Sequence, residues 1–336
     1  SVDYFFNTAS PIDPEDGPSG PLTPEISVIP AADTTNCSGS PTFQFYIDYG
    51  GATEIRGFDV TFTVDSSIVT VNNLFTDFVE GTYLSSYGTT SFFALDLGAG
   101  TYVASGAILG GTTGAIGSGD LFDVVFTPVA GGTSAITVTN VTLRDPDNIP
   151  IAAVWTGGSV LVDCTPPTME PIVEAEGQWY NTAPSFSNFG FDDDVALDTG
   201  EYQIDSGGWG AIFTNLNLPE YNDDGWILPG FAALSEGSHT VHFRVSDMAG
   251  NANGEGTPDT YSWQFYKDTT APAPPTDFVA RPGNTKTHLS WTNPTGDATW
   301  AGVVIRRVGW RDYPQYTGTG PDYPADETEG AFVVQT

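Results

Sequence analysis

Two proline-rich breaks constrain the fold of this chain more than any other feature. The first is Asp163-Cys164-Thr165-Pro166-Pro167, and the second, at 268–275, reads DTTAPAPP. A strand cannot continue through either segment, because proline has no main-chain N–H to donate to a sheet. Strand-rich sequence precedes both breaks. We therefore expect three β-rich units in series, at 25–164, 165–270 and 271–336, after an N-terminal strand and proline-rich linker at 1–24.

Alternation of apolar and polar residues predicts a β-sandwich in the first unit. In segment 57–64 (GFDVTFTV), Phe and Val side chains face one way while Asp and Thr face the other. Segments 43–48, 122–126 and 136–138 repeat the pattern, which slips by one residue at Asn140 and so predicts a β-bulge there. The 39 glycines and 25 prolines suit tight turns between short strands. The expected fold class is all-β, built from serial β-sandwiches.

The charge excludes two classes of partner. The net charge is −33, from 42 acidic and 9 basic residues. Such a surface repels nucleic acid and anionic lipid, and no apolar run approaches the roughly 18–20 residues that span a membrane. We expect neither nucleic-acid binding nor membrane insertion. An acidic, lysine-poor chain fits an extracellular or cell-surface protein, with Ser1 as a mature N-terminus or the edge of a longer chain.

The two cysteines lie at the edges of the first unit. Cys37 precedes its main strands and Cys164 follows its last one. Because the first and last strands of a sandwich can be neighbours, we predict a disulfide, which implies an oxidising compartment. The alternative is a pair of buried free thiols. A zinc site is not expected, because the chain has no CxxC motif and no cluster of histidines.

Three segments of the first unit together resemble a cohesin domain. They are 57–71 (GFDVTFTVDSSIVTV), 100–106 (GTYVASG) and 119–126 (GDLFDVVF) followed by 131–133 (GGT). The resemblance implies a jelly-roll sandwich that binds dockerin modules through one sheet face. Cohesin-like domains also occur in surface proteins without a known dockerin. A disulfide is not part of the usual cohesin pattern.

The second and third units resemble two other extracellular modules. Segment 234–251 (LSEGSHTVHFRVSDMAGN) is similar to bacterial Ig-like repeats, which implies a spacer or adhesive role. In it, Val241, Phe243 and Val245 are expected to point inward, ahead of a hairpin turn at 247–251. Segments 287–291 (THLSW) and 301–307 (AGVVIRR) resemble a fibronectin type III domain. Such a domain needs about 90–100 residues, so we expect that the natural chain continues past Thr336; the alternative is that a neighbouring subunit supplies the completing strand.

The N-terminal segment suggests an assembly mechanism. Tyr4, Phe5 and Phe6 form an apolar run on a proline-rich tether. One interpretation is packing on its own domain, or disorder. The other is a strand donated to a neighbouring subunit, which would build a filament or surface layer.

Catalytic motifs are not found in the sequence. No GxSxG or HExxH motif occurs, and paired carboxylates are expected by chance among 42 acidic residues. His239 and His242 are three positions apart on one expected strand, so they face opposite sides and cannot bind one ion together. We expect no enzymatic activity.

Calcium is the cofactor that the sequence favours. Asp192, Asp194 and Asp198 lie in an acidic segment that we expect to be a loop before a strand. Carboxylate oxygens on loops suit Ca²⁺, although the chain lacks a D-x-[DN]-x-[DN]-G loop. The alternative is a solvated acidic loop whose aspartates cap the local backbone.

Taken together, these patterns predict a secreted or cell-surface structural or adhesive protein that associates with itself or with another surface protein. The alternatives are a cohesin-type receptor for dockerin-bearing partners, or the non-catalytic modules of a secreted polysaccharide-degrading enzyme. Glycan stacking is a further possibility for the aromatic residues near the C-terminus, Trp300, Trp310, Tyr313 and Tyr316.

Overall fold

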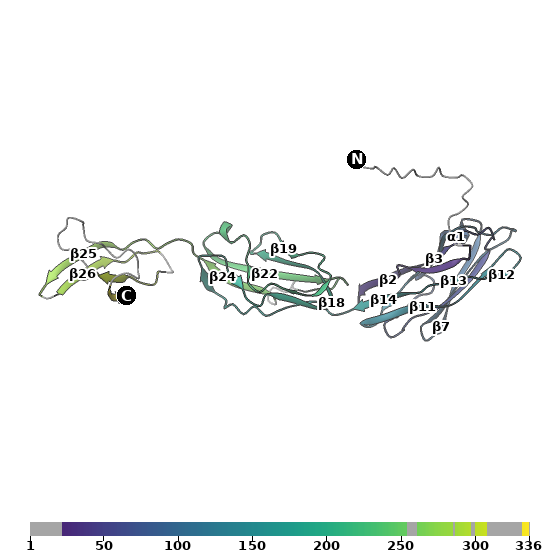
Figure 1. The fold of residues 1–336 in the computed structure, drawn as a ribbon, viewed down its shortest axis with the longest axis horizontal. Helices are drawn as coiled ribbons and strands as arrows, with labels where there is room; N and C mark the ends of the chain where they lie inside the picture. Colours follow the sequence, from purple (N-terminus) through teal and green to yellow (C-terminus); the bar gives the residue numbers. More distant parts are fainter. Residues whose placement is uncertain (1–21, 254–260, 285, 297–299, 308–330, 336) are drawn as a thin grey trace, which may run out of the picture. The chain divides into compact units, whose positions relative to one another are not determined.

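The computed structural model describes residues 22–253, 261–284, 286–296, 300–307 and 331–335. Almost every regular element in them is a β-strand (Figure 1). The all-β fold class predicted from the alternating pattern is confirmed. Within the described residues, no helix is long and apolar enough to cross a membrane.

The chain divides into two compact units. One comprises Ser1–Glu174, Ser185–Trp226 and Thr240–Trp263, and the other Ala175–Pro184, Ile227–His239 and Gln264–Thr336. The domain boundaries expected from the sequence stay a prediction. Every residue of the sites discussed below belongs to the first of these units.

Two main sheets face each other in the first 164 residues. The five-stranded sheet has the order β13 (Val154–Trp155), β1 (Glu25–Ile29), β3 (Thr42–Asp48), β9 (Gly119–Val125), β6 (Phe78–Glu80). The seven-stranded sheet has the order β2 (Ala32–Asn36), β14 (Gly158–Asp163), β11 (Gly132–Arg144), β4 (Gly57–Thr63), β8 (Thr101–Ile108), β7 (Thr90–Gly98), with β12 (Pro150–Ile151) paired to β11. Strands β5 (Val69–Thr70) and β10 (Thr127–Pro128) form a small separate sheet, and α1 (Thr82–Ser85) is a single turn.

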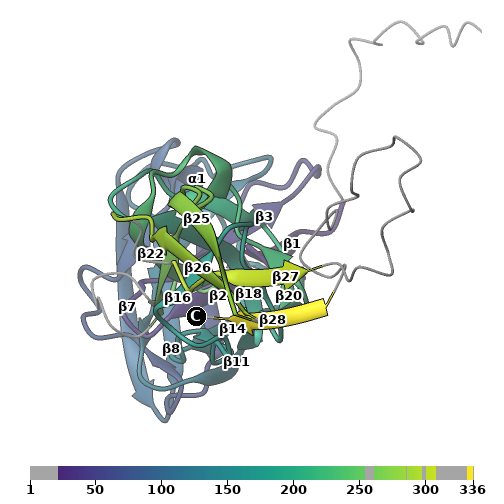
Figure 2. The same ribbon diagram turned by 90° about the vertical axis from the view of Figure 1, so that its left-hand side faces the viewer.

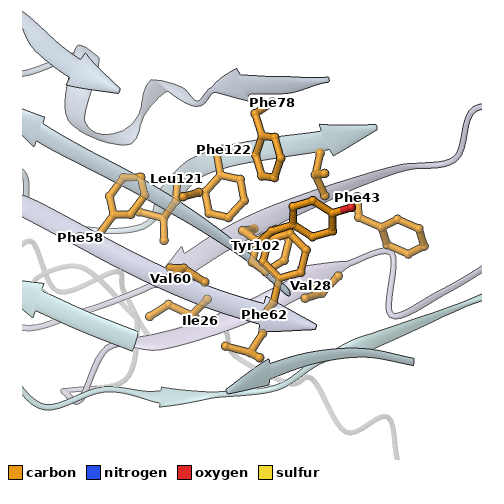
Figure 3. Close-up of a cluster of buried hydrophobic side chains, with 14 of the residues drawn as sticks. Ile26, Val28, Phe43, Phe58, Val60, Phe62, Phe78, Tyr102, Leu121 and Phe122 are labelled. Carbon is orange, nitrogen blue, oxygen red and sulfur yellow. The ribbon is translucent and has the colours of Figure 1, made fainter. Parts of the chain in front are cut away.

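The inner faces of these two sheets meet in an aromatic core (Figure 3). Phe45 of β3 stacks on Phe122 of β9 at 4.4 Å between ring centroids, and Phe62 of β4 lies 4.8 Å from Phe45. All three side chains are completely buried. Each contributes roughly 1.5–3 kcal/mol by leaving water, and their alternation with polar residues fixes which face of each strand turns inward.

The predicted bulge is also confirmed. Strand β11 pairs with β4, and the register shifts between Val138 and Asn140. The extra residue keeps apolar side chains inward on both sides of the bulge, because Val138 and Val141 are both buried.

The following segment forms an eight-stranded sheet. Its order is β15 (Thr168–Met169), β18 (Gly190–Ile204), β22 (Gly237–Asp247), β24 (Ser262–Lys267), β16 (Gln178–Tyr180). Strands β19 (Gly210–Phe213) and β20 (Leu218–Asn222) pair with β18, and β23 (Ala252–Asn253) pairs with β22. A two-stranded sheet of β17 (Ser185–Phe186) and β21 (Trp226–Ile227) and the 3-10 turn Phe231–Ala233 complete it.

Strand β22 has the predicted inward residues, since Val241, Phe243 and Val245 are all buried. The predicted hairpin turn follows it: β22 ends at Asp247, and the chain returns in β23, which pairs with β22. The Asn251 amide N–H donates to Asp247 Oδ1 at 2.8 Å, which closes the turn. The Ig-like resemblance of this segment stays a prediction.

The C-terminal segment contains two hairpins. Strand β25 (Thr276–Gly283) pairs with β26 (Lys286–Thr292), and β27 (Val304–Arg307) pairs with β28 (Ala331–Gln335). The fibronectin type III resemblance is not tested by these hairpins. Of the aromatic cluster expected to bind glycans, Trp310, Tyr313 and Tyr316 lie outside the described residues.

Candidate functional site

The predicted disulfide is present. Cys37 and Cys164 are bonded, with 5.0 Å between their Cα atoms. Cys37 directly follows β2 and Cys164 directly follows β14, and these strands pair in parallel with Asn36 opposite Asp163. The bridge therefore closes the ends of two neighbouring strands of the seven-stranded sheet, the second and the last long strand of the unit.

The predicted calcium ligands lie in a strand, and the expectation of a loop was wrong. Asp192, Asp194 and Asp198 all belong to β18, which runs from Gly190 to Ile204. The strand is irregular here, because its register with β20 shifts between Asp192 and Leu197. Asp192 lies beside Glu170. The pKa of Glu170 is raised, first by its hydrogen bond with the Asp192 carboxyl group, then by burial and by the charge of Asp192.

A different set of carboxylates comes together. One oxygen each of Asp163, Asp193 and Asp247 lies within 4.8 Å of the others. We call these three residues the acidic cluster. Among the residues that the structure describes, no other group of three acidic, histidine or cysteine side chains is gathered so closely. Whether Asp192, Asp194 and Asp198 bind calcium stays a prediction.

The acidic cluster is assembled from three segments far apart in sequence. Asp163 is the last residue of β14, Asp193 sits in the irregular part of β18, and Asp247 is the last residue of β22. Asn251 links two of them, because its Nδ2 donates to the Asp163 main-chain oxygen at 3.0 Å and to Asp247 Oδ2 at 2.8 Å. Residues 163 and 247 are more than 80 positions apart, so no spacing motif could have revealed the cluster.

The environment of the acidic cluster disfavours negative charge. Burial raises the pKa of Asp163 and of Asp247, and the neighbouring carboxylates raise both further. Main-chain amides partly oppose this effect: Thr165 N–H donates to Asp163 Oδ1, and Asn251 N–H donates to Asp247 Oδ1. No basic side chain of the described residues pairs with any of the three; Arg244 pairs with Glu201 instead.

A second feature is an apolar stripe on strand β7, which is an edge strand of the seven-stranded sheet. Phe93, Leu95 and Leu97 are 51%, 47% and 62% exposed, and we call them the β7 stripe. The alternate residues Phe92 and Ala94 pack against the core. The stripe therefore lies on the outer face of the sandwich, along its edge.

The residues beside the β7 stripe on this outer face are smaller than the stripe residues, and the centre of the face is polar. Strands β7 and β8 run side by side (Figure 2), and Phe93 lies opposite Ser105 and Leu95 opposite Val103. Further across the sheet, Asp59 of β4 lies opposite Ser105 and accepts a hydrogen bond from its hydroxyl. The face thus has an apolar edge next to a polar, hydrogen-bonded centre.

The sequence did not reveal the β7 stripe. The run Phe92-Phe93-Ala94-Leu95 is continuously apolar, and such a run predicts a strand buried on both faces. In the described part of the chain nothing packs on the outer side of β7, and alternate residues of the strand are therefore exposed.

The remaining predicted residues are placed as follows. His239 is buried and its Nε2 lies 2.9 Å from the Ser235 main-chain oxygen, while His242 is on the opposite face of β22, as their spacing predicts. Tyr4, Phe5 and Phe6 lie outside the described residues.

Comparison with known proteins gives structural similarity without a family assignment. No protein-family model matches the chain, and no curated protein matches it closely. Among solved structures, the chain is similar to a non-cellulosomal cohesin from Archaeoglobus fulgidus, at 15% identity over 42% of this chain and 91% of that one, with a TM-score of 0.34.

Two further cohesins are similar over comparable shares. The seventh ScaB type I cohesin of Pseudobacteroides cellulosolvens is 15% identical over 46% of this chain and 97% of its own, with a TM-score of 0.36. The sixth cohesin of scaffoldin B from Acetivibrio cellulolyticus, solved with a Cel5 dockerin, is 17% identical over 42% of this chain and 99% of its own, with a TM-score of 0.36.

Proposed function

We propose that this chain is a non-catalytic, extracellular binding protein whose first sandwich holds a protein partner against the outer face of the β11–β4–β8–β7 sheet. The observation that carries the proposal is the β7 stripe. Three large apolar side chains, each about half exposed or more, lie in one row on the outer face of an otherwise well-packed sandwich. Rows of exposed apolar side chains with a polar surround are typical of protein-binding surfaces.

Charge and composition support the same conclusion. An acidic surface excludes nucleic acid and anionic membranes as the partner, and the disulfide between Cys37 and Cys164 suits an oxidising, extracellular environment. The partner is therefore expected to present an apolar patch, with basic groups at its rim that complement the net charge of −33.

A dockerin module is the partner class to test first. The sequence of the first unit resembles a cohesin in segments that form β4, β8 and β9, and two of these strands contribute to the proposed face. Dockerins are the partners recorded with cohesins such as the sixth one of Acetivibrio cellulolyticus scaffoldin B. That this chain binds a dockerin is part of the proposal.

The test measures binding of purified dockerins to immobilised chain, with two sets of variants. Phe93→Ser with Leu95→Ser removes the centre of the β7 stripe. Phe75→Ser is the control because Phe75 is 95% exposed and lies just before β6, a strand of the five-stranded sheet. The proposal predicts at least a tenfold weaker affinity for the double variant, or about 1.4 kcal/mol, and no change for the control. Equal affinity for both would refute the assignment of the face, and absence of binding to any dockerin would refute the partner class.

The assembly hypothesis stays a prediction. It rests on Tyr4, Phe5 and Phe6, which the structure does not describe, so no observation favours strand donation over partner binding. Negative-stain electron microscopy of protein with intact termini distinguishes them: fibres or sheets would support assembly, and dispersed monomers would count against it.

A further inference from the structure

The acidic cluster holds oxygen atoms that have no partner. Asp163 is only 5% exposed, and its Oδ2 is buried without a hydrogen bond. Asp193 Oδ1 is likewise buried and unpartnered, although Asp193 Oδ2 accepts from the amides of Val195 and Ala196 at 2.8 and 2.7 Å. Leaving a buried carboxylate oxygen without a partner is costly unless a proton or a cation occupies the place.

The unpartnered oxygens Asp163 Oδ2 and Asp193 Oδ1 point to a cation. No basic side chain of the described residues faces them, and the nearby N–H groups already donate to other carboxylate oxygens. Two main-chain N–H groups donate to Asp193 Oδ2, one donates to Asp163 Oδ1 and one donates to Asp247 Oδ1. These bonds fix the orientation of each carboxylate and leave one oxygen of Asp163 and one of Asp193 open. A metal site is built in this way, with outer contacts that hold the ligands in place.

We propose that Asp163, Asp193 and Asp247 form a binding site for a divalent cation with the preferences of Ca²⁺. The ligand set is entirely oxygen, which suits Ca²⁺ rather than the nitrogen and sulfur sites of zinc. Ligand oxygens lie roughly 2.3–2.6 Å from Ca²⁺, so two oxygens on one ion are at most about 5 Å apart, and the three oxygens of the cluster meet that limit at 4.8 Å.

The cation would add a further attachment to the connection at 163–167, which the Cys37–Cys164 disulfide and hydrogen bonds from Asn251 and Asn253 already hold. Asp163 begins the proline-containing connection, and Cys164 follows it directly. Asp247 begins the β22–β23 turn, whose Asn251 already donates to the Asp163 main-chain oxygen. An ion bound to both carboxylates joins the end of β14 to this turn and to β18. Binding should therefore stabilise the connection at 163–167 against proteolysis as well as against heat.

The experiment combines calorimetric titration with thermal melting of the intact chain, using Ca²⁺, Mg²⁺ or a chelator in high salt. High salt screens weak binding to the acidic surface. The variants are Asp163→Asn, Asp193→Asn and Asp247→Asn. The matched controls are Asp192→Asn and Asp194→Asn, which neighbour Asp193 and remove the same charge. An asparagine keeps one acceptor oxygen, so the hydrogen bonds of the local backbone are preserved.

The proposal predicts one Ca²⁺ site that is weakened at least tenfold in each cluster variant and unchanged in the controls. It also predicts that the order of melting temperatures reverses between the two conditions. In chelator the cluster variants melt at or above the temperature of the wild type, because one of several buried like charges is removed. In Ca²⁺ they melt below the wild type. If one variant fails to fold, the other two carry the same comparison.

Two results would overturn the proposal. One is the absence of Ca²⁺ binding together with equal melting temperatures in Ca²⁺ and in chelator. The other is loss of binding in Asp192→Asn or Asp194→Asn but not in Asp193→Asn, which would move the site to the residues expected from the sequence. Tighter binding of Mg²⁺ than of Ca²⁺ would contradict the choice of ion.

Discussion

The Cys37–Cys164 disulfide should contribute a large share of the stability of the first sandwich. The bonded residues are 127 positions apart, so the bridge closes a long loop in the unfolded chain. The loop-entropy relation gives about 5 kcal/mol at 25 °C for a loop of this length. Because domains are stable by roughly 5–15 kcal/mol, the bridge would account for a third or more of the total. Residual structure in the reduced, unfolded chain lowers this contribution, so the value is an upper bound.

Differential scanning calorimetry of the wild type and of the Cys37→Ser, Cys164→Ser double variant measures this contribution. A loss of about 5 kcal/mol lowers the melting temperature of a sandwich of this size by roughly 10–20 °C. A reducing agent should shift the wild type and leave the double variant unchanged. If the double variant melted within 2 °C of the wild type, the reasoning from loop closure would be refuted.

Three further predictions concern the core, a buried charge and pH. Phe62→Ala should lower the free energy of unfolding by about 3–5 kcal/mol in chemical denaturation, because Phe62 is completely buried; Phe75→Ala, at 95% exposure, should change it by less than about 0.5 kcal/mol. Lys267→Met should destabilise by about 1–3 kcal/mol, since the buried Nζ donates to two main-chain carbonyl oxygens at 2.7 and 3.3 Å; an unchanged melting temperature would contradict this role. Burial, and then the charge of Asp120, raise the pKa of Asp123, so its ionisation opposes folding above that pKa. Asp123→Asn should therefore raise the melting temperature at pH 7 and have no effect at about pH 3, where Asp123 is protonated in both states.

The sequence predicts the first sandwich well because alternation is a local property. Each of the segments around Phe45, Phe62 and Phe122 shows its inward face by period-2 spacing, and the slip at Asn140 shows the bulge directly. The disulfide was predicted because Cys37 and Cys164 lie near the two ends of one unit, and the structure places them after the paired strands β2 and β14.

The two candidate sites could not be predicted because both depend on which strands become neighbours. The β7 stripe is exposed because no layer of the described residues covers the outer face of β7, whereas the run 92–95 alone predicts a strand buried on both faces. The acidic cluster combines Asp163, Asp193 and Asp247, and within the acidic segment the sequence favoured the residues on either side of Asp193. The hydrogen bonds that turn Asp193 inward come from the irregular backbone of β18, which no composition pattern shows.

Hydrogen–deuterium exchange of the chain, alone and saturated with a bound dockerin, tests the central claim most directly. The account predicts slower exchange in peptides that cover β7, with Phe93, Leu95 and Leu97, and in the neighbouring strand β8, while β1 and β13 of the other sheet are unchanged. Unaltered exchange in β7, or protection restricted to the opposite sheet, would contradict the claim that this face binds the partner.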